Sequence, residues 1–361
     1  MKVAYLTPSL RKSGPNVVLF NLLSGLSANK NNLICDVYYF KNADNLMPFD
    51  SIDNIRVLKV NSLLSLYKSL KGYDVIHSNG IVPDFYAFIF KCLLLFKVKI
   101  VTTVHNNVYH DLFYAKGIIA SIFLGSIWCF LFSFFDKRTF LSKNAIDYYW
   151  FLPFKNKNVI VNNSISFTKN VNKINLRDKY NIPNDCIVLG TCANINRLKN
   201  IDLIIKKMTP TGRFFFFVIG EGDYKISLKE MVSDRGLSER VIFIDFTLTP
   251  EDYMASFDVF MMPSKNEGFG LTILESIASR TPVICSPLPV FKELFDGIVT
   301  FIPDLNDFSL DVIVDAALQS KETTIMEGIN MINGKYSIGY MAARVVSIYE
   351  RMGAAETESN I

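Results

Sequence analysis

Short apolar runs alternate with amphipathic stretches along the first half of the chain. Runs of this kind bounded by polar turns are typical of strands buried in a parallel sheet, and leucine or valine recurring every three or four residues is typical of crossover helices. Asn16–Ala28 has the helical spacing. The expected strands are Lys2–Thr7, Leu33–Phe40, Ile55–Val60, Asp74–Ser78, Lys99–His105, Thr139–Ser142 and Val159–Asn162.

A polar stretch, Asn162–Asp178, interrupts this alternation and is the best candidate for a linker. The pattern then begins afresh, with helices expected at Asp223–Arg235 and Thr249–Ser256 and a last one at Ile338–Met352. The expected strands are Cys186–Ala193, Arg213–Gly220, Arg240–Phe246, Val259–Pro263, Pro282–Cys285 and Val299–Pro303. We therefore expect an α/β fold with two Rossmann-like, doubly wound domains facing a cleft.

Composition adds constraints on partners and compartment. Half of the 361 residues are apolar and a fifth are charged, which excludes a disordered chain. A net charge of +4 favours anionic partners such as diphosphates or anionic lipid, but is too small to indicate a nucleic-acid binder. The six cysteines form no CxxC pair and there are three histidines, so we expect no metal site and a reduced, cytosolic protein.

One segment does not fit a simple globular pattern. Gly117–Phe135 is nineteen residues long and uncharged, and its length allows a membrane-spanning helix, a buried core helix or an interfacial helix. The nearby Phe85–Val98, an aromatic-rich stretch in which Lys91 and Lys97 are the cations, favours the interfacial alternative.

The sharpest chemical signal is Met262–Ser276, MPSKNEGFGLTILES, in which a strand, a glycine-bearing loop and a helix follow one another. We expect the helix to begin near Phe269. A helix start presents free backbone N–H groups and the positive end of its dipole, so it suits a diphosphate, and glycine lets the backbone approach closely. The residues expected to bind the nucleotide here are Gly268, Phe269, Gly270, Leu271 and Thr272.

Two acids flank this phosphate site. Glu267 lies in the loop and Glu275 inside the helix. Carboxylates accept hydrogen bonds from vicinal hydroxyls, so one acid would hold the sugar and the other the ribose of a nucleotide sugar. Isolated glutamates are more often solvated surface charges, but the strand–loop–helix context favours the functional interpretation.

The stretch PSKNEGFGLTILESIASRTPVICS resembles the donor-site signature of glycosyltransferase family 4, whose members are retaining enzymes of the GT-B fold. VIGEGDY, with Gly220, and SLRKSGP, with Gly14, resemble the family's glycine-bearing turns, although the second motif usually carries two glycines. The resemblance implies that Gly14 and Gly220 also bind the nucleotide sugar. The resemblance implies an acceptor domain, 1–165, and a donor domain, 166–335. A helix, 336–353, would cross back to the N-terminal domain, ahead of a disordered tail, 354–361.

Three further residues complete the expected site. In ANINRLKN, Arg197 and Lys199 would neutralise the leaving diphosphate; Lys199 matches the family pattern, whereas Arg197 stands at a neighbouring position. His105, at the end of KIVTTVH, is implied to contact the transferred sugar rather than zinc. His77, which also follows a strand, is left open between an acceptor-side and a structural role.

These observations favour a retaining glycosyltransferase that moves a hexose-type sugar from a nucleoside-diphosphate sugar to a glycan or lipid-linked oligosaccharide in bacterial surface polysaccharide (O-antigen or capsule) biosynthesis. A UDP-sugar is favoured over a GDP-sugar as donor, no cofactor or metal is expected, and Glu267, His105, Arg197 and Lys199 are the expected catalytic residues. We expect a cytoplasmic protein, peripheral at the inner face of the cell membrane. The alternatives are a nucleotide-sugar epimerase of the same fold and a non-catalytic partner subunit.

Overall fold

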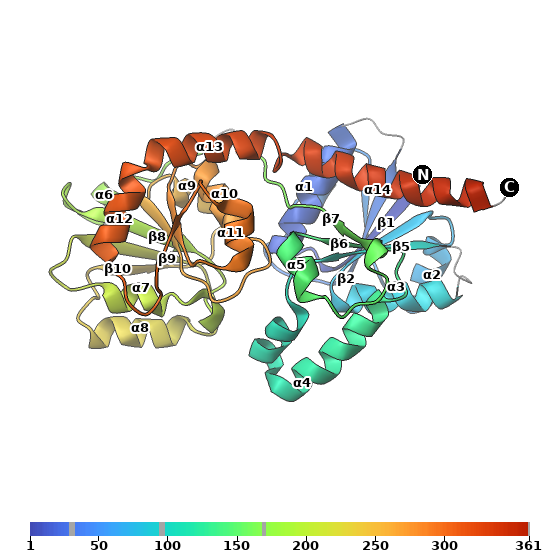
Figure 1. Ribbon diagram of the computed structural model, residues 1–361, viewed down its shortest axis with the longest axis horizontal. Helices are drawn as coiled ribbons and strands as arrows, with labels where there is room; N and C mark the ends of the chain where they lie inside the picture. Colours follow the sequence, from blue (N-terminus) through green and yellow to red (C-terminus); the bar gives the residue numbers. More distant parts are fainter. Residues whose placement is uncertain (29–32, 94–97, 168–170, 360–361) are drawn as a thin grey trace. The chain divides into compact units, whose positions relative to one another are not determined.

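The computed structural model describes residues 1–28, 33–93, 98–167 and 171–359. The chain divides into two compact units. Unit 1 consists of Met1–Ser166 and Gly334–Ile361, and unit 2 of Phe167–Asn333. Each unit is built on one parallel sheet with helices on both faces (Figure 1), so the fold is α/β with two Rossmann-like units.

Unit 1 has a seven-stranded sheet in the order β3-β2-β1-β4-β5-β6-β7, and neighbouring strands are parallel. Every strand expected in this half is present, with ends that differ by one or two residues. The strands are β1 (Lys2–Ser9), β2 (Ile34–Lys41), β3 (Ile55–Lys59), β4 (Val75–Asn79), β5 (Lys99–Val104), β6 (Lys137–Phe140) and β7 (Asn158–Ile160).

The helices of unit 1 cover the two faces of this sheet because successive side chains of a strand point to opposite sides. Ala4, Leu6 and Ile76 belong to a core with residues of α2, α3, α4 and α5, whereas Tyr5 and His77 face α14, beside which α1 packs. The helices are α1 (Gly14–Ala28), α2 (Leu63–Leu70), α3 (Ile81–Leu93), α4 (Val108–Phe132), α5 (Lys143–Tyr148) and α14 (Ile338–Ser359).

A buried hydrogen-bond network fastens α14 to the sheet. The Tyr349 hydroxyl lies 2.8 Å from the Tyr5 hydroxyl and 2.6 Å from His77 Nδ1, while His77 Nε2 lies 2.7 Å from Thr103 Oγ1. Burial lowers the pKa of His77 to about 3. His77 is therefore a neutral structural partner of α14. The helix continues to Ser359, past the end expected at residue 353, because the alanines and glutamates that follow favour helix.

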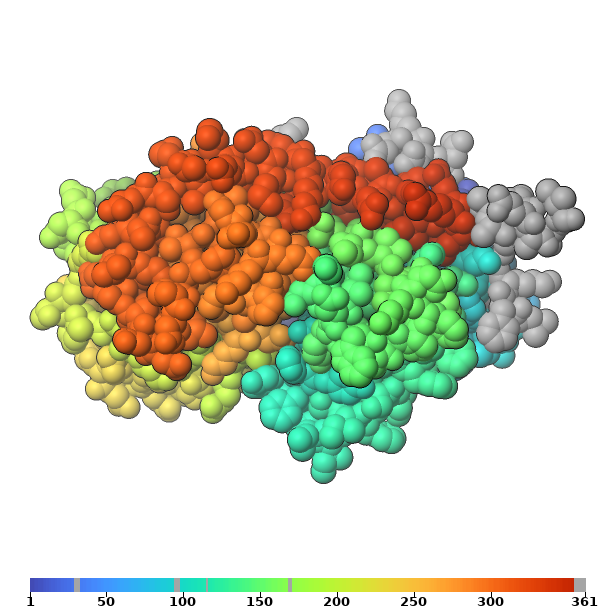
Figure 2. Space-filling model, in the orientation of Figure 1, coloured from blue at the N-terminus to red at the C-terminus, as the bar shows by residue number. Residues whose placement is uncertain are grey.

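The nineteen-residue apolar segment lies in α4. Gly117 has φ 83° and interrupts the helix, and no helix among the described residues is long and apolar enough to cross a membrane. A core helix is also the wrong description, because the outer side of α4 is exposed: Ile119 is 82% and Phe123 66% accessible. These side chains belong to a projection on the surface of unit 1, at the bottom of Figure 2.

The inner side of α4 is attached to the core of unit 1. Trp128 donates from its indole nitrogen to Asp84 at 2.6 Å, and Ser78 and Thr102 donate to the same carboxyl. Burial raises the pKa of Asp84 to about 6. Lys91, expected as a surface cation beside the apolar stripe, is instead buried in an ion pair with Asp136, and Lys97 lies outside the described residues.

Unit 2 has a six-stranded parallel sheet in the order β10-β9-β8-β11-β12-β13. All strands expected in this half are present: β8 (Ile187–Cys192), β9 (Phe214–Ile219), β10 (Val241–Ile244), β11 (Val259–Met262), β12 (Val283–Cys285) and β13 (Thr300–Phe301). The helices are α6 (Leu176–Lys179), α7 (Asp202–Lys207), α8 (Lys225–Asp234), α9 (Pro250–Met254), α10 (Leu271–Ala278), α11 (Pro289–Phe295), α12 (Leu310–Gln319) and α13 (Lys321–Asn333).

Candidate donor and acceptor sites

Each sheet has one place where the direction of strand addition reverses. In unit 1 it lies between β1 and β4, and in unit 2 between β8 and β11. At such a switch point the loops leave in opposite directions and open a crevice at the carboxyl ends of the strands, where ligands of doubly wound sheets bind. The residues expected to be functional lie in the loops after these strands.

In unit 2 the switch point brings Lys199 and Glu267 together. Lys199 follows β8 and Glu267 follows β11, and Lys199 Nζ lies 2.6 Å from Glu267 Oε1. Ser264 Oγ donates to the same oxygen at 2.8 Å. Among the described residues, both of these contacts fall on Oε1, and Oε2 is a further acceptor.

The short 3-10 helix η3 (Arg197–Lys199) presents Lys199. The Asn196 side chain caps it by accepting from the backbone N–H groups of Leu198 and Lys199. Arg197 is exposed, and its guanidinium lies 4.9 Å from the centre of the Tyr224 ring. The structure thus brings Lys199 into contact with Glu267, while Arg197 stacks on an aromatic ring beside it.

The helix after the glycine loop begins at Leu271, two residues later than expected. Gly270 adopts φ 97°, which ends the loop, and a Cβ there would come 2.8 Å from Phe291 Cε1. Phe269 is buried with its ring 5.8 Å from that of Phe295. The Phe269 side chain therefore belongs to the core, and any contact of this residue to a ligand falls to its backbone.

The remaining residues expected at this helix start are half-buried. Gly268 and Leu271 flank the turn, and the Thr272 hydroxyl donates to Met262 Sδ at 3.5 Å. Glu275 lies in the second turn of α10. Burial raises the pKa of Cys192, the last residue of β8, and the Glu275 charge adds to this effect.

Gly220 has a packing role. It adopts φ 135°, and a Cβ there would lie 1.9 Å from the carbonyl oxygen of Ala193. The turn after β9 thus supports the loop that carries Lys199, and Ile195 N–H donates to the Glu221 carbonyl at 2.7 Å. Its expected contact with the nucleotide stays a prediction.

In unit 1 the switch point holds a cavity of about 220 Å³. Its walls come from the ends of β1, β4 and β5 and from the starts of α1 and α4. Gly14 opens α1 between Ser13 and Pro15, which both line the cavity, and nothing lies within 4 Å of where its Cβ would be.

His105 lines this cavity. Its Nε2 lies 3.0 Å from Asn79 Oδ1, and burial lowers its pKa to about 4. The imidazole is therefore neutral at pH 7. Because an amide oxygen only accepts, Nε2 carries the proton and the unprotonated Nδ1 is an acceptor.

Two residues in the cavity wall, Asp111 and Trp128, were not predicted from the sequence. Asp111 accepts from Asn106 Nδ2 at 2.6 Å, and Trp128 reaches the cavity from the far end of α4 while bonded to Asp84. A lone acid soon after the histidine could have indicated Asp111. Trp128 carried no signal, because it lies within an uncharged apolar run.

Comparisons with known proteins identify the family. The model described as glycosyl transferases group 1 matches residues 172–307. The chain is 38% identical over 356 residues to the O-antigen biosynthesis glycosyltransferase WclY of Escherichia coli, covering 98% of this chain and 99% of WclY. It is also 38% identical over 112 residues to the O-antigen chain mannosyltransferase RfbU of Salmonella typhimurium, covering 29% of this chain and 31% of RfbU.

The structure of Anabaena HepE in complex with UDP and glucose superimposes with a TM-score of 0.76 over 100% of both chains at 16% identity, which supports the GT-B fold. WclY is matched along nearly its whole length and the family model covers the donor-site motif. The chain therefore belongs to the group 1 glycosyl transferases.

Proposed function

We propose that the protein is a retaining glycosyltransferase of family 4 that transfers a hexose-type sugar from a nucleoside-diphosphate sugar, with UDP favoured as the nucleotide, to a glycan or lipid-linked oligosaccharide of a bacterial surface polysaccharide. The acceptor class is supported by WclY and RfbU, which are named for O-antigen synthesis. The donor class is supported by HepE, which was solved with UDP and with UDP-glucose.

The observation that carries this proposal is the Lys199–Glu267 pair at the switch point of unit 2, beside the start of α10. The backbone N–H groups of Leu271 and Thr272 and the Lys199 ammonium would hold the two phosphates. Glu267 would bind the sugar hydroxyls and Glu275 the ribose. The pair leaves Lys199 close enough to a bound diphosphate to exchange its carboxylate partner for a phosphate oxygen.

The chemistry then needs positioning and charge stabilisation rather than a protein nucleophile. As the bond between the sugar and the diphosphate breaks, negative charge grows on the leaving oxygens, and Lys199 with Arg197 would stabilise it. The leaving phosphate would take the proton of the acceptor hydroxyl as that oxygen bonds to the sugar on the same face.

The cavity of unit 1 suits neutral hydroxyl groups. His105 offers an uncharged acceptor nitrogen, and Asn106 and Asp111 supply further polar atoms. We assign His105 to the transferred sugar and the remainder of this cavity to the acceptor. A neutral imidazole binds a hydroxyl without attracting the diphosphate away from unit 2.

We further propose that the exposed side of α4 rests on the inner face of the cell membrane. Ile118, Ile119, Ile122, Phe123 and Phe130 are all exposed on this helix. A contiguous apolar surface of this kind marks an interaction site, and apolar side chains at an interface insert among lipid headgroups. Trp128 and Asp111 of the same helix line the cavity, so a lipid-linked acceptor would reach it along α4.

Donor turnover tests the enzymatic proposal. Release of nucleoside diphosphate from UDP-, GDP- and dTDP-sugars would be measured with and without a glycan acceptor, for the wild type and Glu267→Ala. We expect turnover that depends on the acceptor and falls by at least about a hundredfold in the variant. Lys265→Ala, an exposed cation of the same loop, is the matched control.

Three outcomes would contradict the enzymatic proposal. Equal activity of Glu267→Ala and wild type would remove the donor-site assignment. An isomerised donor formed without acceptor would favour the epimerase. Turnover of none of the donors would favour the non-catalytic partner.

Vesicle co-sedimentation tests the membrane proposal. Ile119→Ser with Phe123→Ser should reduce binding to vesicles containing phosphatidylglycerol by about tenfold or more, because two inserting side chains are lost. Ile226→Ser, which removes an apolar side chain that is 72% exposed on α8, should leave binding unchanged. Equal sedimentation of all three proteins would overturn the membrane contact.

A further inference from the structure

A second cavity of unit 1, of about 320 Å³, lies at the opposite edge of the sheet from the cavity that His105 lines. Lys99 and Lys137 are the first residues of β5 and β6, and both line it. Ligands of the transfer reaction bind at the carboxyl ends of strands, whereas this cavity lies at their amino ends. It is therefore separate from the site described above.

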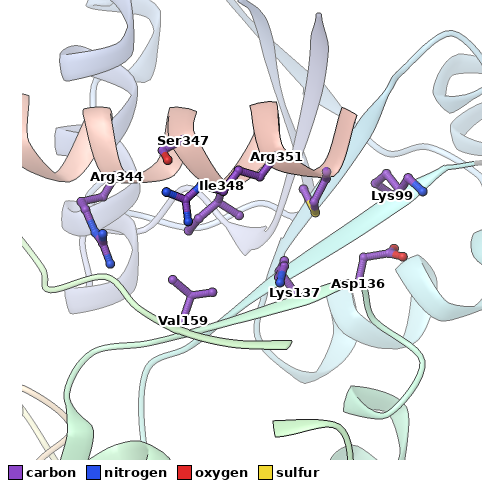
Figure 3. Close-up of a pocket in the computed structure, with 9 residues that line it drawn as sticks. Lys99, Asp136, Lys137, Val159, Arg344, Ser347, Ile348 and Arg351 are labelled. Carbon is purple, nitrogen blue, oxygen red and sulfur yellow. The ribbon is translucent and has the colours of Figure 1, made fainter. Parts of the chain in front are cut away.

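The other wall is the face of α14 that carries Arg344, Ile348 and Arg351. Residues spaced by three, four and seven positions lie on one side of a helix. Figure 3 shows Arg344 and Arg351 on the side of α14 that faces Val159 and Lys137. The cavity thus combines four cationic side chains with an apolar floor made by Val159, Ile348 and Met352.

The one acid that lines this cavity is already engaged by groups outside the lining. Asp136 already pairs with the buried Lys91 and accepts from the Ile100 N–H at 2.7 Å. The contacts of Lys137 and Arg344 are to backbone carbonyls, those of Asn156 and Ile160, which carry no net charge. A cationic cavity with donors on two walls favours a multivalent anion, because arginine binds phosphate oxygens through paired N–H donors.

We propose that this cavity binds a small phosphate-bearing ligand, clamped between α14 and the amino ends of β5 and β6. The volume suits a diphosphate or a phosphorylated small molecule whose apolar part rests on Ile348 and Met352. A ligand free in solution is favoured as the source of the phosphate over a lipid headgroup. The reason is that the apolar side of α4 and the α14 wall lie on opposite faces of the sheet (Figure 1).

Hydrogen–deuterium exchange with inorganic pyrophosphate tests this site locally. Pyrophosphate should slow exchange of the peptide that covers residues 338–352 and of the start of β6. In Arg344→Gln with Arg351→Gln, the concentration needed for half-maximal protection should rise about tenfold or more, since two charged donors are lost. Lys59→Gln with Lys68→Gln removes the same charge from exposed positions of unit 1 and should leave protection unchanged.

Two further measurements distinguish binding at this cavity from other causes of slowed exchange in α14. Lys199→Gln should keep the protection of α14, because a diphosphate bound in unit 2 contacts different residues. If the arginine variant folds poorly by circular dichroism, Lys137→Gln tests the opposite wall. Protection by phosphatidylglycerol vesicles without protection by pyrophosphate would assign the phosphate to a lipid headgroup. Absence of protection by both, or protection that survives in the arginine variant, would overturn the proposal.

Discussion

The two switch points share one topology and differ in chemistry. In unit 2 the loops after β8 and β11 place a lysine against a glutamate, next to a helix start. In unit 1 the loops after β1, β4 and β5 enclose a cavity in which the histidine is neutral and bonded to an asparagine. The sheet therefore determines where a ligand can bind, and the loops determine whether the site suits a diphosphate or a hydroxyl.

The two sites also differ in how tightly the backbone is held at the helix start. In unit 2 the turn at Gly270 is fixed by a positive φ and by the aromatic side chains beneath it, so it tolerates no Cβ. In unit 1 the corresponding helix start at Gly14 is open. A rigid turn suits a diphosphate because its N–H groups must point at the phosphates before the ligand arrives.

The largest effect we expect comes from the charged pair. Lys199→Gln should lower kcat by about a hundredfold, because it removes the cation that faces the leaving diphosphate. Arg197→Gln should cost about tenfold or less, since its guanidinium stacks on Tyr224. Steady-state release of nucleoside diphosphate measures both. A larger loss in Arg197→Gln than in Lys199→Gln would reverse the roles assigned to the two cations.

The glycine turns give the next largest effect. Gly270→Ala should lower the free energy of unfolding by about 1–3 kcal/mol, because of the positive φ and the contact with Phe291. Gly14→Ala should change it by no more than about 1 kcal/mol and in the stabilising direction, because alanine favours helix. Urea denaturation measures both variants, and equal destabilisation would show that the two turns do not differ in rigidity.

Substitution of Tyr349 tests whether His77 has a structural role, because the two side chains share the hydrogen-bond network that holds α14 on the sheet. Tyr349→Phe should destabilise the protein by about 1–2 kcal/mol, because it removes the hydroxyl shared by Tyr5 and His77. Tyr340→Phe, on the exposed side of the same helix, is the control. Unchanged stability of Tyr349→Phe would mean that apolar packing alone holds α14.

The pH dependence should show the smallest effect. The pKa of His77 falls from 6.5 to about 3 on folding, so the native state stays unprotonated while the unfolded state gains a proton as the pH falls. The stability from this group is full above about pH 6.5 and is lost toward pH 3. Between pH 7 and 6, His77→Gln should lose about 0.7 kcal/mol less stability than the wild type.

Asp84 has the opposite effect on stability over the same pH range. Because its pKa is raised, the native state gains a proton as the pH falls toward 6, whereas the unfolded state does not. The comparison between wild type and His77→Gln removes this contribution, since Asp84 is present in both. Denaturation curves at the two pH values provide the measurement. Parallel curves for the two proteins would show that the pKa of His77 does not differ between the native and the unfolded state.

Much of the fold followed from local pattern. Period-two and period-3.6 signals depend on neighbouring residues only, so they located every strand of both sheets and the helix start after Gly270 to within two residues. Glycines and charged residues in the loops after strands also indicated Lys199 and Glu267 as candidate site residues. Their chemistry depends on residue type, which the sequence states directly.

Contacts between residues far apart in the sequence could not be predicted from local pattern. The hydrogen bond of His77 to Tyr349, the burial of Lys91 against Asp136 and the position of Trp128 in the wall of the unit 1 cavity all depend on how distant segments pack. The same holds for the basic cavity beside α14, in which Arg344 and Arg351 lie more than two hundred positions after Lys137 in the chain. The sequence by itself determined the elements and the chemistry of each loop, because both are local. The tertiary structure alone decided which side chains are neutralised, buried or brought together, because burial and pairing arise only when distant strands and helices meet.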